Sequence, residues 1–268
     1  MNALTSLIKQ HALVIFCALT IALAFAATLL PRPGEVIPVV MVFVLALVAV
    51  ALTAISEGKT GVRSLLGKLA QWRISLKRVV IALTLALMMR LTMSLIALGL
   101  GLMPALQLRP GPPAQFGILA VILFIFATPE ELGWRGYALP KLLEHRSPLA
   151  AGLIVGVLWG SLHLGLHLPG LMFAGLPLLP TRPQLIGLSV LIIGLYMHTG
   201  GNILLTSLFH GAQSYFVIAN EGLPPTPQVW LVAGVYLASA FIVVIATGPS
   251  VARKPAAQSR YSKMCVNQ

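Results

Sequence analysis

Two adjacent carboxylates, Glu130 and Glu131, stand in an otherwise apolar part of the chain and are its first candidates for chemistry. The chain has only six acidic residues, all of them Glu, and thirteen uncharged residues from Gln115 to Ala127 lead into this pair. An ionised carboxylate at bilayer depth costs about 2.5 kcal/mol or more. A Glu pair kept in such a segment is therefore predicted to serve a function.

The neighbouring residues predict the local geometry of this pair. Glu131 and Arg135 are four residues apart, so they share a helix face and are expected to form an ion pair. Glu130 points about 100° away from Glu131 on the same helix and is expected to stay available for chemistry. Two interpretations of Pro129 remain open. Either Thr128 caps a helix that begins at Pro129, or Pro129 interrupts one continuous helix.

Three histidines in apolar segments can complete a site with this carboxylate. His163 and His167 share one face of a predicted helix, and His210 lies in a later helix. Each could be only an interhelical hydrogen-bond donor, but buried ionisable groups tend to face the bundle interior and one another. A Glu with two His can activate water and stabilise an oxyanion. The same set of Glu130, His163 and His210 could instead hold Zn²⁺, with an open position for water.

The composition predicts that these residues are positioned by membrane helices. Hydrophobic residues make up 58% of the 268 and charged residues only 9%, against about 25% charged in a soluble domain. Several apolar runs approach the roughly 20 residues that cross the hydrocarbon as a helix, and the sequence shows no alternating segments of the kind found in barrels. We therefore predict an all-α, polytopic membrane helix bundle of about eight transmembrane helices, forming a single integral membrane domain over residues 1–268.

Eight apolar segments are the predicted spans. The first is interpreted as an uncleaved anchor, because its apolar run exceeds the roughly 7–15 residues of a signal-peptide core. The sixth is short unless it is tilted or partly re-entrant. The basic segment Glu57–Arg78, which includes Trp72, predicts a helix lying on the lipid headgroups. The spans are Leu13–Leu30, Val36–Ile55, Val79–Met103, Gln115–Leu139, Leu149–Leu168, Gln184–Met197, Ile203–Ala219 and Val229–Ala246.

The net charge of +12 predicts an orientation in the membrane. With the N-terminus in the cytoplasm, alternating spans place 13 of the 18 Lys and Arg residues on the cytoplasmic side and 3 on the other. This bias, which includes the basic tail 249–268, predicts a plasma (inner) membrane protein with both termini cytoplasmic. Nucleic-acid binding is not indicated, because no binding motif accompanies the charge. Arg90, inside the third span, either pairs with a buried Glu or faces a polar interior.

Two further details follow from these spans. Cys17 and Cys265 are far apart and predict neither a disulfide nor a cysteine-based zinc site. His163 lies roughly 22 Å into its span, whereas His210 lies roughly 12 Å from the opposite bend of its own. Their depths converge if the fifth helix starts earlier, near Leu143, or if the predicted helix ends are wrong by several residues.

Three motifs in this order resemble those of a known family of membrane proteases. They are similar to the core motifs of the CAAX protease and bacteriocin-processing (CPBP) family, which includes the type II CAAX prenyl endopeptidases. The resemblance covers about residues 115–216. It implies an intramembrane endopeptidase that hydrolyses a peptide bond near the cytoplasmic membrane face, with a peptide or a membrane protein as its substrate. The motifs are Glu130-Glu131-x-x-x-Arg135, Trp159-x-x-x-His163 and His210, the last preceded by Thr199-Gly200-Gly201-Asn202.

The resemblance also implies a role for each matching residue. Glu130 would be the catalytic carboxylate, His163 its partner in activating water, and His210 the residue that stabilises the oxyanion. Glu131 and Arg135 would support this site. The family has been interpreted both as metalloproteases and as metal-free glutamate enzymes, so Zn²⁺ remains an option and the sequence requires no cofactor.

Ser214 departs from the family pattern. The family usually has Asn, and sometimes Asp, four residues after the last His, where this chain has a serine hydroxyl that can still donate a hydrogen bond. This departure favours a second hypothesis, a non-catalytic scaffold or bacteriocin self-immunity protein of the same fold, because fold does not imply function. A third hypothesis, a proton-coupled carrier, would also use buried Glu and His, but no internal repeat is visible.

Overall fold

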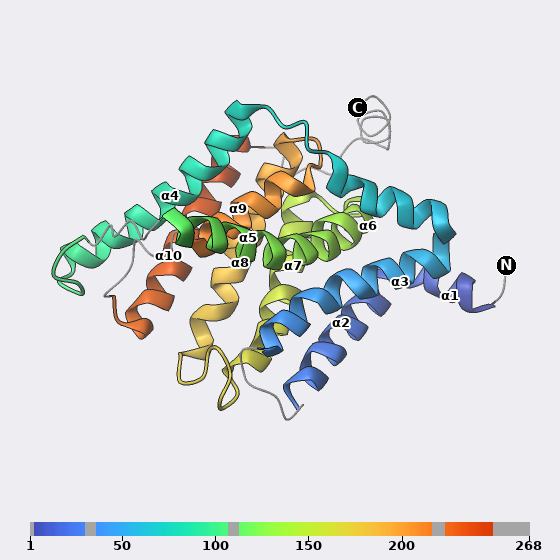
Figure 1. Ribbon diagram of the computed structural model, residues 1–268, viewed down its shortest axis with the longest axis horizontal. Coiled ribbons are helices and arrows are strands. Elements are labelled where there is room, and N and C mark those ends of the chain that lie inside the picture. The colour runs from blue at the N-terminus through green and yellow to red at the C-terminus, as the bar shows by residue number, and fades with distance from the viewer. Residues whose placement is uncertain (1–2, 30–35, 107–112, 216–222, 249–268) are drawn as a thin grey trace.

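The computed structural model describes residues 3–29, 36–106, 113–215 and 223–248, and in these ranges all of the regular secondary structure is helical (Figure 1). The predicted all-α bundle is therefore confirmed. The α-helices are α1 (Ala3–Gln10), α2 (Ala12–Thr28), α3 (Val36–Gly67), α4 (Leu76–Gly99), α5 (Pro113–Glu131), α6 (Leu139–Leu143), α7 (Pro148–His163), α8 (Leu178–His198), α9 (Ile203–Tyr215) and α10 (Pro225–Thr247). Two 3₁₀ turns, η1 (Lys68–Ala70) and η3 (Leu164–His167), and a π-helix, η2 (Leu132–Ala138), extend them.

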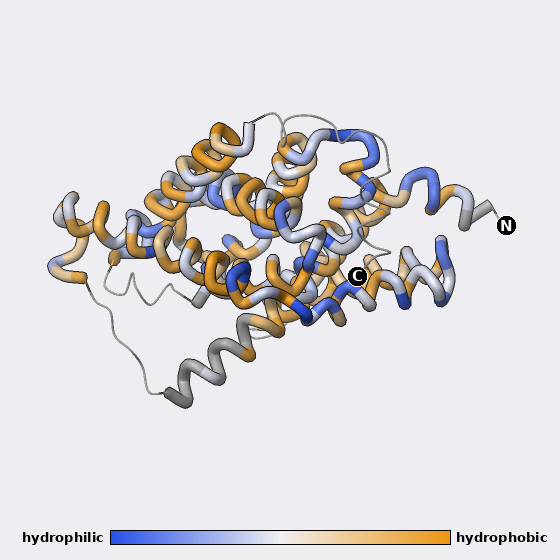
Figure 2. The backbone as a smooth tube through the Cα atoms, turned by 90° about the horizontal axis from the view of Figure 1, so that it is seen from above, coloured by the Kyte–Doolittle hydropathy of each residue, from blue (hydrophilic) through white to orange (hydrophobic). Residues whose placement is uncertain are grey.

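Five of the described helical stretches are long and apolar enough to cross a membrane, and the chain is an integral membrane protein. The predicted count of eight is not confirmed, because α2 is a shorter apolar helix of 17 residues and α9 has 13 residues. Most of the helices consist mainly of hydrophobic residues, and hydrophilic residues concentrate at certain bends and helix ends (Figure 2). The five stretches are Val36–Ala70, Leu76–Gly99, Pro148–His167, Leu178–His198 and Pro225–Thr247.

Two predicted segments need correction. The sixth span begins at Leu178 rather than Gln184, because the helix α8 continues through Pro183. It has 21 residues and is not short. The single headgroup helix predicted over Glu57–Arg78 is also wrong. The helix α3 ends at Gly67 after a break at Gly58 (φ 68°, ψ −161°), and Trp72, 72% exposed, lies in a non-helical link.

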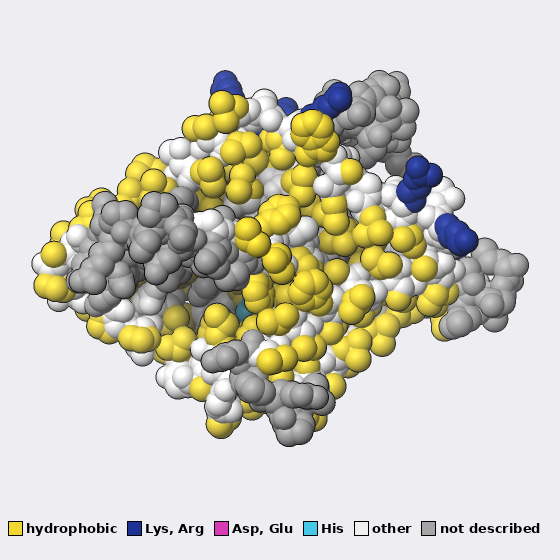
Figure 3. Space-filling model, viewed as in Figure 1, with side chains coloured by type: hydrophobic (Ala, Val, Ile, Leu, Met, Phe, Trp, Pro, Cys, Tyr) yellow, Lys and Arg dark blue, Asp and Glu magenta, His cyan; other side chains and the backbone are white. Residues whose placement is uncertain are grey.

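The basic residues that are visible in Figure 3 gather along one edge of the molecule, over the second half of α3 and the link to α4. Hydrophobic side chains cover most of the rest of that face. A distribution of this kind agrees with the positive-inside rule, but the direction of insertion stays a prediction. The basic tail and Cys265 lie outside the described residues, whereas Cys17 in α2 is a free thiol.

The helices that carry the candidate residues pack around one interior. The helix α8 packs against α7 and α10, α9 packs against α5 and α4, and α3 packs against α2 and α5. Two glycines allow close approach, as small residues do in membrane bundles. A Cβ on Gly156 would lie 2.6 Å from Cα of Ile186, and one on Gly187 would lie 2.8 Å from the carbonyl carbon of Tyr236. These contacts hold α7, α8 and α10 together beside α5 and α9 (Figure 1).

Candidate active site

The Glu pair lies where one helix changes its pitch. Helix α5 begins at Pro113, continues through Pro129 and ends at Glu131, and the π-helix η2 follows directly. The prediction of a continuous helix with an internal proline is therefore confirmed. The alternative in which Thr128 caps a new helix is wrong, because residues before it are already helical. Single π-helical turns inside α-helices are frequent at functional sites.

Contacts from α3 and its extension hold the π-helix in place. A Cβ on Gly133 would lie 2.9 Å from Cβ of Leu45, so a glycine is required where η2 crosses α3. The Nζ of Lys68 donates a hydrogen bond of 2.7 Å to the carbonyl oxygen of Gly136. This bond satisfies a carbonyl within the widened turn. Lys68 belongs to the basic segment Glu57–Arg78, which was predicted to lie on the lipid headgroups, and nothing in the local sequence indicates this contact.

Glu131, itself fully buried, lies at the centre of a polar network. Its Oε1 accepts hydrogen bonds from Nη1 of Arg135 at 2.8 Å and from Nδ1 of His210 at 3.1 Å. Glu131 and Arg135 are both 0% exposed, and the predicted ion pair between them is confirmed. The guanidinium of Arg135 also lies over the ring of Trp159, 4.9 Å from its centroid, and approaches Oγ of Ser189 at 3.4 Å.

His163 is held in one tautomer by its own helix. Its Nδ1 lies 3.0 Å from the carbonyl oxygen of Trp159, which can only accept, so Nδ1 carries the hydrogen. In the neutral imidazole, Nε2 is then the acceptor. This is the form that a base needs in order to remove a proton from water.

His210 is oriented by Glu131 in a comparable way. Its Nδ1 donates to a carboxylate oxygen, so Nε2 is an acceptor when the ring is neutral and a donor only when the ring is protonated. The oxyanion role that the resemblance implies therefore requires the imidazolium form.

The turn before α9 sets the register of His210. Gly200 and Gly201 have φ values of 70° and 89°, which favour glycine. The side chain of Asn202 then accepts a hydrogen bond of 2.9 Å from the N–H of Leu205, as an N-cap residue does. Helix α9 consequently starts at Ile203, and His210 lies two turns into it.

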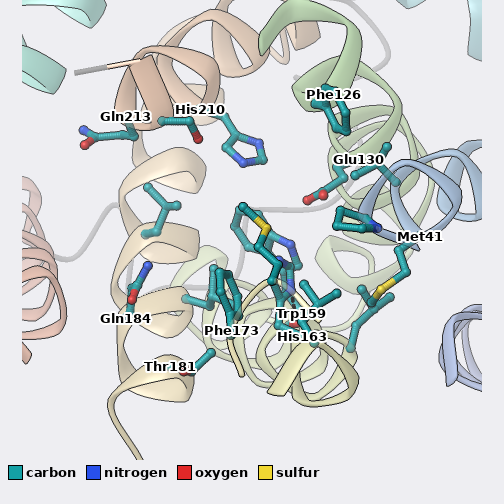
Figure 4. Close-up of a pocket in the computed structure, with 18 of the residues that line it drawn as sticks. Met41, Phe126, Glu130, Trp159, His163, Phe173, Thr181, Gln184, His210 and Gln213 are labelled. Atoms are coloured by element: carbon teal, nitrogen blue, oxygen red, sulfur yellow. Dashed lines mark hydrogen bonds between the residues drawn. The ribbon is translucent and has the colours of Figure 1, made fainter. Parts of the chain in front are cut away.

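Glu130, His163 and His210 come from α5, α7 and α9 and line the same cavity, which has a volume of about 740 Å³. Glu130 is 6% exposed, and its carboxylate points into this cavity across from His210, with Trp159 and His163 on the adjoining wall (Figure 4). Ser214 lines the cavity too, whereas Glu131 is not among the lining residues. The two carboxylates therefore have different surroundings.

The zinc alternative does not fit this arrangement. Within the part of the chain that the structure describes, no three His, Cys, Asp or Glu side chains are grouped closely enough to hold a metal ion. We therefore derive no catalytic step through a metal held by Glu130, His163 and His210.

Several residues of the site have roles that sequence reasoning missed. Trp159 belongs to one of the motifs, but the sequence assigned it no role of its own. The centroid of its ring lies 4.9 Å from that of His210 and 6.0 Å from that of His163. Arg90 lines the cavity and donates to the main-chain carbonyl of Gln213, so it faces the polar interior. The side chain of Gln213 accepts from the hydroxyl of Tyr236 at 2.9 Å.

Two other histidine predictions have clear outcomes. His167 shares the helical run with His163 but does not line the cavity. It contacts Thr181 and the carbonyl of Leu176 instead. The helix of His163 does not start near Leu143, because Ser147 caps α7 immediately before Pro148. Both His163 and His210 nevertheless reach the cavity, so the relative offset of α7 and α9 brings them together.

Comparison with known proteins identifies the segment that carries this site. Residues 112–216 match the family model described as type II CAAX prenyl endopeptidase Rce1-like. No curated protein matches the chain significantly. The matched segment extends from the start of α5 to the end of α9 and contains all of the candidate residues named above. The match covers 105 of the 268 residues and is consistent with the CAAX protease family that the motifs resemble.

Proposed function

We propose that this protein is an intramembrane endopeptidase that hydrolyses a peptide bond near the cytoplasmic membrane face. The observation that carries the proposal is that Glu130, His163 and His210, from three different helices, line the same cavity. The family match supports a protease of the CAAX type. The substrate is a peptide or a membrane protein, because the cavity lies among membrane-spanning helices and is lined mainly by apolar side chains.

In the proposed mechanism, a water molecule lies between Glu130 and Nε2 of His163. Glu130 removes a proton from this water as it attacks the carbonyl carbon of the substrate, and His163 orients it. Protonated His210 donates from Nε2 to the developing oxyanion, and the hydroxyl of Ser214 is a second donor. When the tetrahedral intermediate collapses, the C–N bond breaks and Glu130 returns its proton to the leaving amine. Glu131, which is itself paired with Arg135, holds His210 in position.

The replacement Glu130→Gln tests this mechanism. It keeps the shape of the side chain but removes the base, so we expect cleavage of peptides by the purified protein in detergent to fall by about 10²- to 10⁴-fold. Glu144→Gln is the matched control, because Glu144 is 59% exposed and lies in a loop away from the cavity. Equal cleavage by the wild type and Glu130→Gln would remove Glu130 from the mechanism.

Ser214 favours the alternative, a non-catalytic scaffold or self-immunity protein of the same fold. It is an exposed serine on the cavity wall where the family usually has Asn. If it acts as an oxyanion donor, Ser214→Ala should lower kcat by roughly 10-fold or more with little change in KM. A wild type without activity together with an active Ser214→Asn variant would support the scaffold hypothesis. Unchanged kcat in Ser214→Ala would remove the hydroxyl from the mechanism.

A further inference from the structure

The connection between η3 and α8 forms one wall of the cavity. In the sequence it lies between the predicted fifth and sixth spans and carries none of the motifs. Five of its residues line the cavity, as does His163 on α7. These residues are Gly170, Leu171, Met172, Phe173 and Leu176.

Phe173 brings this wall into contact with His163. The two rings are stacked, with centroids 6.2 Å apart and an interplanar angle of 18°. Both residues line the cavity, and Figure 4 shows Phe173 beside Trp159 and His163. A peptide bond within hydrogen-bond reach of Nε2 of His163, about 3 Å, must therefore have a neighbouring substrate group close to the phenyl ring.

Hydrogen bonds hold Phe173 in this position. Its main-chain N–H donates to the carbonyl of Leu166 at 2.9 Å. His167 anchors the end of the connection, since its Nδ1 lies 3.3 Å from the carbonyl oxygen of Leu176 and its Nε2 lies 3.0 Å from Oγ1 of Thr181. A neutral imidazole satisfies both contacts, donating at Nδ1 and accepting the Thr181 hydroxyl at Nε2.

The backbone of the connection is shaped to keep the wall in place. Gly170 and Gly175 have φ values of 79° and 80° and turn the chain on either side of Phe173. The ring of Phe173 also lies 5.5 Å from that of His167, tilted by 60°. A wall held at both ends cannot easily yield to a larger group. It can therefore discriminate between substrate side chains by their volume.

We propose that Phe173 is a specificity-determining residue that limits the size of the substrate side chain next to the cleaved bond, and that His167 and Thr181 hold it in position. This inference rests on the proposed peptidase function. With the phenyl ring in place, only small side chains fit in the cavity beside Phe173 and His163. Removal of the ring opens space for an aromatic side chain without removing any group from the proposed catalytic set.

The test uses a peptide library whose members differ only at the residues flanking the cleaved bond. We measure the ratio of kcat/KM for Phe and Ala at each flanking position. Phe173→Ala should shift this ratio toward Phe by about 10-fold or more at one position, since filling or opening a pocket by a few methylenes changes discrimination by 10- to 200-fold. Phe173→Leu should give a smaller shift in the same direction. Leu179→Ala, at a position that is 71% exposed and does not line the cavity, should leave the ratio unchanged.

A second pair of variants tests how the wall is held. Thr181→Val keeps the shape of the side chain but removes the hydroxyl that donates to His167, so the wild-type preference for small side chains should weaken several-fold. Thr181→Ser keeps the hydroxyl and should retain the wild-type ratio. Equal loss of preference in both variants would assign the effect to packing and would overturn the role of the His167 contact.

The outcomes separate this inference from the function on which it rests. A wild-type protein that cleaves no member of the library overturns the peptidase proposal and the inference with it. Normal cleavage by Phe173→Ala and Phe173→Leu with an unchanged ratio overturns the inference alone. A uniform fall in kcat/KM for every peptide would show that Phe173 only supports the fold near His163, and this too would overturn the inference.

Discussion

Glu130 and Glu131 are neighbours in the chain but belong to two different regions of the molecule. Glu131 is fully buried behind the cavity, where a single oxygen accepts hydrogen bonds from Arg135 and His210. Glu130 is 6% exposed and lines the cavity itself. The comparison shows how a single residue step along a helix, a rotation of about 100°, can separate a carboxylate that stabilises the site from one that is available to a substrate.

The physical difference lies in what each charge interacts with. The charge of Glu131 is compensated by a guanidinium that is itself buried and stacked on Trp159. Removing one partner of such a pair leaves an uncompensated buried charge, which typically costs about 3–5 kcal/mol. Glu130 faces a cavity large enough for water or substrate. Its replacement is therefore expected to affect chemistry more than folding.

The largest expected effect on stability comes from Glu131→Gln. It leaves Arg135 buried without its carboxylate, so the free energy of unfolding should fall by about 3–5 kcal/mol. Unfolding by SDS titration in detergent micelles measures the change. Glu57→Gln is the control, because Glu57 is 48% exposed and lies 3.7 Å from Lys141, and such surface pairs contribute about 0–1 kcal/mol. If Glu130→Gln destabilised the protein as much as Glu131→Gln, the proposed division between the two carboxylates would be wrong.

An intermediate effect is expected from the aromatic residue that links the two regions. Trp159→Leu removes the ring that faces Arg135 and His210, and the lost cation–π contact should cost about 0.5–2 kcal/mol beyond the loss of packing. Trp159→Phe keeps an aromatic face and should recover most of that contact. The same SDS titration measures both variants, and equal destabilisation by both would exclude a cation–π contribution.

The smallest effect is expected at the edge of the buried network. Ser189→Ala removes a hydroxyl that lies 3.4 Å from Arg135, a distance at which a hydrogen bond is weak. The free energy of unfolding should fall by less than about 1 kcal/mol, with no change in the specificity of cleavage. Ser161→Ala, on an exposed part of α7, provides the baseline. A loss as large as that of Glu131→Gln would mean that Ser189, rather than the carboxylate, controls the position of Arg135.

The contacts that are local in sequence could be predicted. Residues four apart on a helix are neighbours whatever surrounds the helix, so the pairing of Glu131 with Arg135 follows from spacing alone. The apolar composition likewise predicts membrane helices whatever the tertiary packing of those helices is. Helix ends were less predictable. Pro183 and the segment around Trp72 took conformations that depend on packing and on individual backbone angles.

The sequence by itself determined that this protein is an all-α membrane protein and which few residues in its apolar segments can carry charge. It also showed that three of its motifs resemble those of CAAX proteases. Only the tertiary structure decided that His210 contacts Glu131, that Glu130 reaches the cavity, and that Phe173 lies on His163. The physical reason is the range of the interactions. Helix spacing and hydrophobicity act over a few residues, whereas these contacts join segments up to 79 positions apart and depend on how the helices pack.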